Sequence, residues 1–170
     1  MPHPLVLQLR FARSEFLRGI DSVTDEDACR RVMPMNCISW NVGHLAWQEQ
    51  RYWLTRGQGR TLRLDVQEQF ASGGPGSTPL LSTTLAAWRE IVAEADPWLD
   101  QLTVVDLEEE QEFAPGFDIL VTNGSLLLRM IYHYWYHTGE NAAIRQMLGH
   151  RDLPDFVGDI DGEAPYIAEG

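Results

Sequence analysis

Two histidines and a carboxylate recur at helical spacing in the last third of the chain. His133, His137 and Glu140 lie in the string YHYWYHTGENAAIRQMLGH, at steps of four and three residues. On a helix, residues at these steps project from one face, so the two imidazoles lie about one turn apart. Such a pair can bind a single metal ion, as it does in other helical metal sites.

The same helical stripe is otherwise apolar, which indicates that the histidines face the protein interior. A buried polar group without a partner is costly, and a metal ion would satisfy all three side chains. The alternative is an ordinary core role, in which each imidazole bonds to a backbone carbonyl or to a nearby tyrosine hydroxyl. The tyrosines available for that role are Tyr132, Tyr134 and Tyr136.

A third histidine, His44, lies in a second helical stretch, within SWNVGHLAWQE. That stretch is apolar on most of its sides, which is typical of a central helix. A helical bundle can bring His44 opposite the pair at 133 and 137. Three protein nitrogens with an open position are typical of a catalytic metal site rather than a structural one. By position alone, Asn41 and Arg129 are candidates for orienting a substrate or a histidine.

Four long helical segments are needed to position these residues. Apolar periodicity predicts helices over residues 5–20, from 36 or 39 to 54, over 82–102 and over 125–148. Pro97 is expected to kink or interrupt the third of them. Thr24 and Asp27 resemble a capping box for a short turn of helix that Pro34 closes. Four helices without paired strands predict an all-α, four-helix bundle that forms one domain over residues 1–170.

The segments between the helices are polar. Residues 58–82, with ASGGPGSTP at their centre, are predicted to form a long crossover connection. Residues 103–123 carry an acidic run that we interpret as solvated surface, and 117–121 as a short extended piece that makes no sheet. Residues 150–170 are rich in Pro, Gly and Asp, and we expect an irregular tail laid over the bundle.

Composition excludes several kinds of chemistry. The chain of 170 residues has a net charge of −12, and all 13 of its strongly basic residues are arginine. A catalytic Schiff-base lysine and a P-loop lysine are therefore excluded. The acidic balance also disfavours binding to nucleic acids and to anionic membrane surfaces.

Cysteine content and hydropathy indicate the cellular compartment. Cys29 and Cys37 are too few for a disulfide framework in a chain of this size, and a small buried thiol is the simplest role for Cys37. No signal peptide and no apolar run long enough for a membrane span are present in the sequence. We therefore expect a cytoplasmic protein.

The order of these motifs resembles the DinB/YfiT-like superfamily of metalloenzymes. The resemblance rests on SWNVGHLAWQEQRYW, SGGPGSTPL, AAWREIVAEADPWLD and YHYWYHTGENAAIRQMLGH, which together span nearly the whole chain. It implies a four-helix bundle with long crossover connections. It also implies one divalent metal ion (zinc, nickel or iron) bound by His44, His133 and His137. Many members of the superfamily have glutamine at the position of Glu140, so its role as a ligand, an orienting group or a catalytic acid or base stays open.

The resemblance also implies a class of activity. Relatives include thiol S-transferases and isomerases that use low-molecular-weight thiols such as bacillithiol or mycothiol, and many are homodimers. We therefore expect a metal-dependent enzyme that transfers such a thiol to a small-molecule substrate. A metal-dependent hydrolase, and a stress protein that holds a metal or small ligand without catalysis, are the alternatives.

Overall fold

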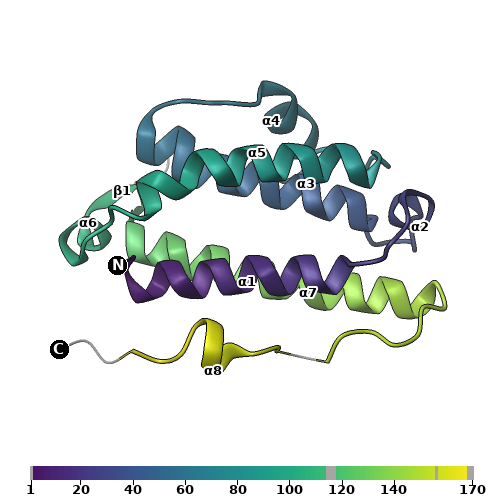
Figure 1. The fold of residues 1–170 in the computed structure, drawn as a ribbon. Helices are drawn as coiled ribbons and strands as arrows, with labels where there is room; N and C mark the ends of the chain where they lie inside the picture. Colours follow the sequence, from purple (N-terminus) through teal and green to yellow (C-terminus); the bar gives the residue numbers. More distant parts are fainter. Residues whose placement is uncertain (1, 114–117, 156, 168–170) are drawn as a thin grey trace.

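The computed structural model describes residues 2–113, 118–155 and 157–167, and four long helices dominate it. Helix α1 (Pro4–Ile20) packs along α7 (Asn123–Met147), and α3 (Ile38–Glu49) packs along α5 (Leu81–Leu99). Figure 1 shows these two pairs as two layers, with α1 and α7 in one and α3 and α5 in the other. The predicted all-α, four-helix bundle is therefore confirmed.

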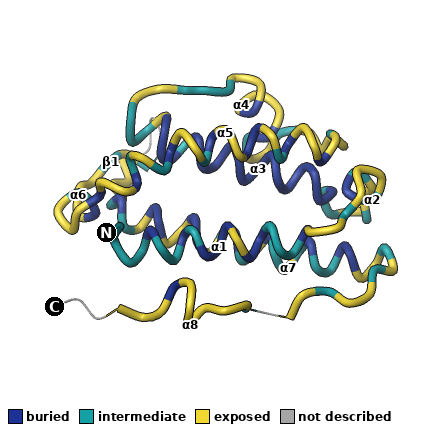
Figure 2. Tube along the Cα trace, in the orientation of Figure 1, coloured by how far each residue is buried: buried dark blue, intermediate teal, exposed yellow. Residues whose placement is uncertain are grey.

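Helix α3 is the central helix of the bundle. It contacts α5 and α7, and all 12 of its residues are buried. Figure 2 shows buried residues along the sides of the four helices that face each other across the two layers. Because α3 is enclosed in this way, every polar side chain on it needs a partner within the protein.

The central helix ends in a wider, π-helical turn, whereas the apolar periodicity of the sequence predicted that it continues as an α-helix to residue 54. After α3 the chain continues directly into η1 (Gln50–Arg56), a stretch of π-helix. Such stretches are rare and are often found at functional sites. Here the wider turn changes the direction in which the side chains after Glu49 project.

The predicted ends of the long helices are close to those observed. Pro97 does not interrupt α5, which continues for two residues and ends at Leu99 rather than near residue 102. Helix α7 begins two residues earlier than predicted, with the Thr122 hydroxyl accepting a hydrogen bond from the Ser125 N–H at 3.1 Å. Pro97 has no N–H to donate to the carbonyl of residue 93, but hydrogen bonding resumes after it, since the Asp100 N–H donates to the Asp96 carbonyl at 2.9 Å.

The connections are more ordered than their composition predicted. They contain four short helices: α2 (Asp25–Cys29), α4 (Leu64–Phe70), α6 (Val104–Glu108) and α8 (Ile160–Glu163). Thr24 caps α2 as predicted, but that helix ends at Cys29, well before Pro34. The tail follows the outer side of the α1–α7 layer, where the Gln8 side chain donates a hydrogen bond to the Ala164 carbonyl at 2.6 Å.

The expectation that residues 103–123 contain no paired strands was wrong. Strand β1 (Glu110–Glu112) pairs with β2 (Leu120–Thr122) as an antiparallel hairpin, with Gln111 opposite Val121. Each strand has only three residues and none of them is buried, so no alternation of polar and apolar residues marks either strand in the sequence. Part of the predicted extended piece at 117–121 lies outside the described residues.

A buried polar network joins the four main helices. Arg13 of α1 donates two hydrogen bonds to the Glu49 carboxylate of α3, at 2.8 and 2.6 Å. Tyr134 of α7 donates to the same carboxylate at 2.7 Å, and Trp88 of α5 donates to the Tyr134 hydroxyl at 2.7 Å. The Arg13 guanidinium also reaches Asp96 of α5 at 2.7 Å. Because one network takes a side chain from every helix, it fixes how the helices are arranged.

The network also sets the charge states of its members. Burial disfavours a charged guanidinium, yet the Glu49 carboxylate beside it raises the pKa of Arg13 above its ordinary value. Burial and the same carboxylate raise the pKa of Tyr134 well above 10.0. Arg13 is therefore charged and Tyr134 is neutral at physiological pH.

Among the described residues, no helix has both the length and the apolar character needed to cross a bilayer.

Candidate metal centre

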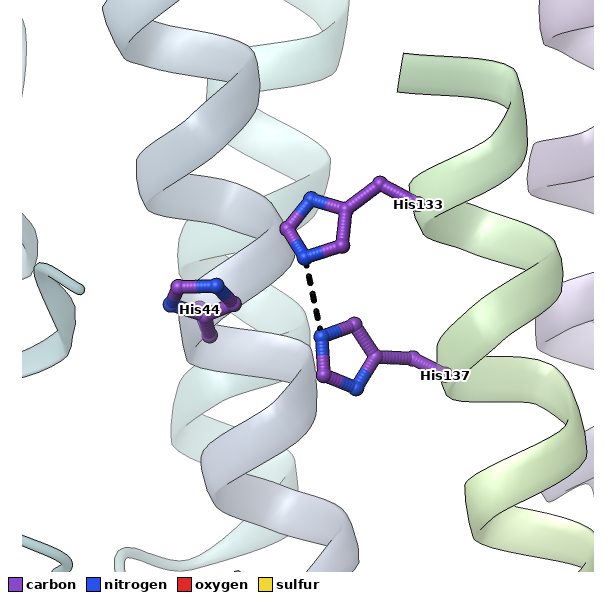
Figure 3. Close-up of side chains that lie close together, drawn as sticks. All are labelled: His44, His133 and His137. Carbon is purple, nitrogen blue, oxygen red and sulfur yellow. Dashed lines mark hydrogen bonds between the residues drawn. The ribbon is translucent and has the colours of Figure 1, made fainter. Parts of the chain in front are cut away.

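The structure brings together the three histidines that the sequence singled out. His44 projects from α3, and His133 and His137 project from neighbouring turns of α7 toward it (Figure 3). One nitrogen from each ring lies within 4.8 Å of the other two. His44 and His137 are buried, at 8% and 6% exposure, while His133 is half-buried.

The two histidines of α7 direct the same ring nitrogen toward each other. The Nε2 atoms of His133 and His137 are 3.0 Å apart. Two nitrogens bound to one ion at about 2.1 Å each are separated by roughly 3 Å when they occupy adjacent coordination positions. The pair is therefore already spaced for a shared ion.

In His44 and His137, a hydrogen bond at Nδ1 leaves the Nε2 nitrogen with a free lone pair. The Phe70 carbonyl can only accept, so His44 donates to it from Nδ1 at 2.8 Å and keeps Nε2 free of a proton. His137 donates from Nδ1 to the Glu140 carboxylate at 2.7 Å, which leaves its Nε2 as an acceptor. A carbonyl or carboxylate on the far nitrogen is the usual way in which proteins orient metal-binding histidines.

His44 and His133 are uncharged at neutral pH. Burial lowers the pKa of His44 to about 4. Burial, together with the two neighbouring histidines, lowers the pKa of His133 to about 3. Neutral imidazoles are the form that binds metal, and the site's chemistry therefore fits a divalent ion.

Glu140 belongs to a second layer of contacts around the cluster. Its carboxylate accepts from His137 Nδ1 and, at 3.0 Å, from the Asn41 side-chain amide. Asn41 also donates to the Asn141 side-chain oxygen at 2.8 Å. This arrangement places Glu140 behind His137 rather than beside the three facing nitrogens. Asn41, singled out from its position in the sequence, lies in this layer.

The sequence analysis missed two contacts on the side of His44. Its ring stacks against Trp40 with centroids 4.9 Å apart and an interplanar angle of 11°. Its Nδ1 partner is a backbone carbonyl at the end of α4, a helix that was not predicted. A backbone acceptor leaves no signature in residue type, so only the structure could reveal it.

The remaining candidates lie elsewhere. Cys37 precedes α3, where its thiol contacts the Ser39 hydroxyl and the Ser77 carbonyl. The Cys29 thiol donates to the Pro79 carbonyl at 2.9 Å. His3 caps α1, and His150 contacts Asp27 at 3.2 Å. Neither cysteine nor either of these histidines belongs to the cluster.

Gly43 allows the Phe70 segment to approach His44. A Cβ atom at position 43 would lie 2.7 Å from the Phe70 ring. That ring is itself buried. We expect Gly43→Ala to lower the free energy of unfolding by about 1–2 kcal/mol, because the overpacking exceeds the helix propensity gained. Chemical denaturation measures this change.

Gly139→Ala is the matched control, since nothing lies within 4 Å of a Cβ at that position of α7. It should leave stability unchanged or raise it by up to about 1 kcal/mol. Equal effects of the two substitutions would show that the contact between Gly43 and Phe70 is unimportant.

Comparison with known proteins adds a family and a fold. A family model described as the DinB superfamily matches residues 8–140. Among solved structures, a conserved protein from Enterococcus faecalis superposes with a TM-score of 0.66 at 17% identity, over 88% of this chain and 99% of that one. At that identity the likeness shows the fold alone. No curated protein matches the chain.

Proposed function

The chain belongs to the DinB superfamily, and on that premise we propose that it is a metal-dependent enzyme that transfers a low-molecular-weight thiol to a small electrophile. The observation that carries the proposal is the facing set of three imidazole nitrogens, two of them 3.0 Å apart. A divalent ion held by His44, His133 and His137 would lower the pKa of a bound thiol and so supply a thiolate at neutral pH.

The protein's own residues would fix the orientation of the three ligands. The Phe70 carbonyl holds His44 through Nδ1, and Trp40 packs flat on the same ring. Glu140 holds His137 through Nδ1 and is itself held by Asn41. With three histidine ligands, coordination positions are left for a thiol or a substrate. The half-buried ring of His133 marks the side from which such a molecule reaches the centre.

An activity assay tests the proposal directly. Metal-loaded protein would be mixed with bacillithiol or mycothiol and a general electrophile, and formation of the thioether followed over time. We expect turnover by the natural protein and loss of at least about a hundredfold in His137→Ala. Equal rates in both proteins, or no turnover with either thiol, would contradict thiol transfer. Hydrolysis without thiol would favour the hydrolase, and bound metal without any turnover would favour a binding protein.

Glu140 is proposed to be a positioning residue that acts through His137. We expect Glu140→Ala to weaken the affinity for Zn²⁺ by about 10–100-fold, the usual cost of losing such a partner. Glu140→Gln keeps an oxygen that can accept from His137 Nδ1, so it should recover most of that loss. Competition with a fluorescent chelator measures both affinities.

Glu68→Ala removes an exposed carboxylate of α4 and serves as the control. It should leave the affinity for Zn²⁺ unchanged. Zn²⁺ affinity that is intact in Glu140→Ala would contradict the positioning role, and so would failure of glutamine to restore it.

A further inference from the structure

Three arginine side chains gather around one aromatic ring near the histidine cluster. Arg51 and Arg56 project from η1 and Arg129 from α7. Their guanidinium carbons lie 5.8, 5.6 and 4.9 Å from the centre of the Phe113 ring. The first two also lie over Tyr52, at 5.9 and 5.5 Å. Three positive charges therefore converge in a protein whose net charge is −12.

None of these three arginines has a carboxylate partner among the described residues. Within the part of the chain that the structure describes, the one hydrogen bond made by a guanidinium of the group is donated by Arg51 to the Phe113 carbonyl, at 3.4 Å. Arg56 also borders an acidic cleft lined by Asp106, Glu109 and Glu110, but no described carboxylate lies within 4.0 Å of it. By contrast, other arginines of the chain form ion pairs: Arg10, Arg13, Arg18, Arg30, Arg60 and Arg63.

Arg56 is the arginine of the group with buried, unsatisfied hydrogen-bond donors. Its Nη1 and Nη2 atoms are both buried, and neither has a hydrogen-bond partner in the described structure. Burial, followed by repulsion from Arg51, lowers the pKa of Arg56. A buried guanidinium with two unpartnered donors is unfavourable unless an acceptor binds it. An acceptor that offers two oxygens, such as a carboxylate or a phosphate group, matches these donors.

The arginines lie close to the histidines along the chain. Arg129 precedes His133 by four residues on α7, and Arg51 follows His44 by seven residues, just after the π-helical turn begins. Trp47 connects the two groups, because its ring lies 5.3 Å from that of His44 and 5.2 Å from the Arg51 guanidinium. Seven helical residues correspond to about 10 Å along the axis.

A cleft runs beside Trp47 and two of the three arginines. Its volume is about 410 Å³, and its lining includes Trp47, Arg51 and Arg56. A cleft of this size is in the range that holds a small organic molecule. A molecule with an anionic group at one end could therefore contact the arginines while its other end lies near His44.

We propose that Arg51, Arg56 and Arg129 form an oxyanion site, which holds a carboxylate or phosphate group of the small molecule on which the histidine centre acts. The claim that this molecule is a substrate of the histidine centre rests on the proposed function. Binding of the oxyanion does not rest on it, because the three guanidinium groups supply positive charge and hydrogen-bond donors without a metal ion.

Metal-stripped protein at low ionic strength provides the test. Isothermal titration calorimetry with inorganic phosphate, and separately with succinate, should give one binding site per chain. Arg56→Gln and Arg129→Gln should each lower the affinity for the tighter-binding of the two anions by about tenfold or more. Tighter binding of phosphate would identify a phosphate ester as the natural ligand class, and tighter binding of succinate a carboxylate. The control is Arg89→Gln, which removes an exposed arginine of α5 and should not change the affinity.

Thermal unfolding provides a second readout. Because the two Nη atoms of the half-buried Arg56 are buried without a hydrogen-bond partner, Arg56→Met should raise Tm in anion-free buffer and abolish the rise that phosphate gives the natural protein. His133→Ala should still bind phosphate, which separates this proposal from the metal proposal. The inference is overturned if neither anion binds the natural protein, or if Arg89→Gln weakens binding as much as Arg129→Gln does.

Discussion

His137→Ala is expected to lower the affinity of the protein for Zn²⁺ by at least about a hundredfold. Loss of an outer contact alone costs 10–100-fold, and His137 supplies a nitrogen to the cluster itself. That nitrogen lies 3.0 Å from Nε2 of His133, and Glu140 directs it there. Competition with a chelator of known affinity measures the change.

His150→Ala is the matched control, because it removes an imidazole that contacts Asp27 and does not belong to the cluster. It should bind Zn²⁺ as the natural protein does. Circular dichroism checks that the His137 variant is folded. If the folded His137 variant kept its full affinity, the ligand assignment would be wrong.

Glu49→Ala is expected to lower the free energy of unfolding by about 3–5 kcal/mol. The substitution leaves the Arg13 guanidinium, 3% exposed, without its bidentate partner, and breaking a buried ion pair from one side costs this much. It also removes the acceptor of the Tyr134 hydroxyl. Urea denaturation followed by tryptophan fluorescence measures the loss.

Glu94→Ala is the control, because it breaks the exposed Arg60–Glu94 pair and should cost less than about 1 kcal/mol. The double variant Arg13→Met with Glu49→Leu should be more stable than Glu49→Ala, because it removes both buried charges together. Equal losses in Glu49→Ala and Glu94→Ala would show that the buried network contributes little to stability.

The three histidines could be predicted from the sequence because helical spacing and apolar surroundings are both visible in it. His133 and His137 lie four residues apart on an apolar stripe, and His44 lies on a helix that is apolar on most of its sides. These patterns define which face of each helix is inward, and a bundle then places inward faces opposite each other. The same reasoning predicted the four long helices.

The contacts that orient the histidines could not be predicted in the same way. The partner of His44 is a main-chain carbonyl of Phe70, and no residue type indicates such an acceptor. The pairing of Arg13 with Glu49 joins residues 36 positions apart and depends on how two helices are aligned. Of the arginine group, Arg129 alone was singled out from the sequence, by its position before His133. The π-helical turn that brings in Arg56 left no signal in the apolar periodicity.

Dimerisation and a cytoplasmic location stay predictions from the sequence. Analytical ultracentrifugation tests the first of them. A dimer is expected at micromolar concentration, and a monomer at every concentration would contradict it.

The most direct test of the metal centre is X-ray absorption spectroscopy on purified protein titrated with Zn²⁺ to saturation. We expect one ion per chain with three imidazole nitrogens at about 2.0–2.1 Å and the remaining positions filled by non-protein ligands. This signal should be absent from the triple variant in which His44, His133 and His137 are alanine. Sulfur ligands, fewer than three imidazoles, or an unchanged spectrum in the triple variant would show that the three histidines do not form the metal centre.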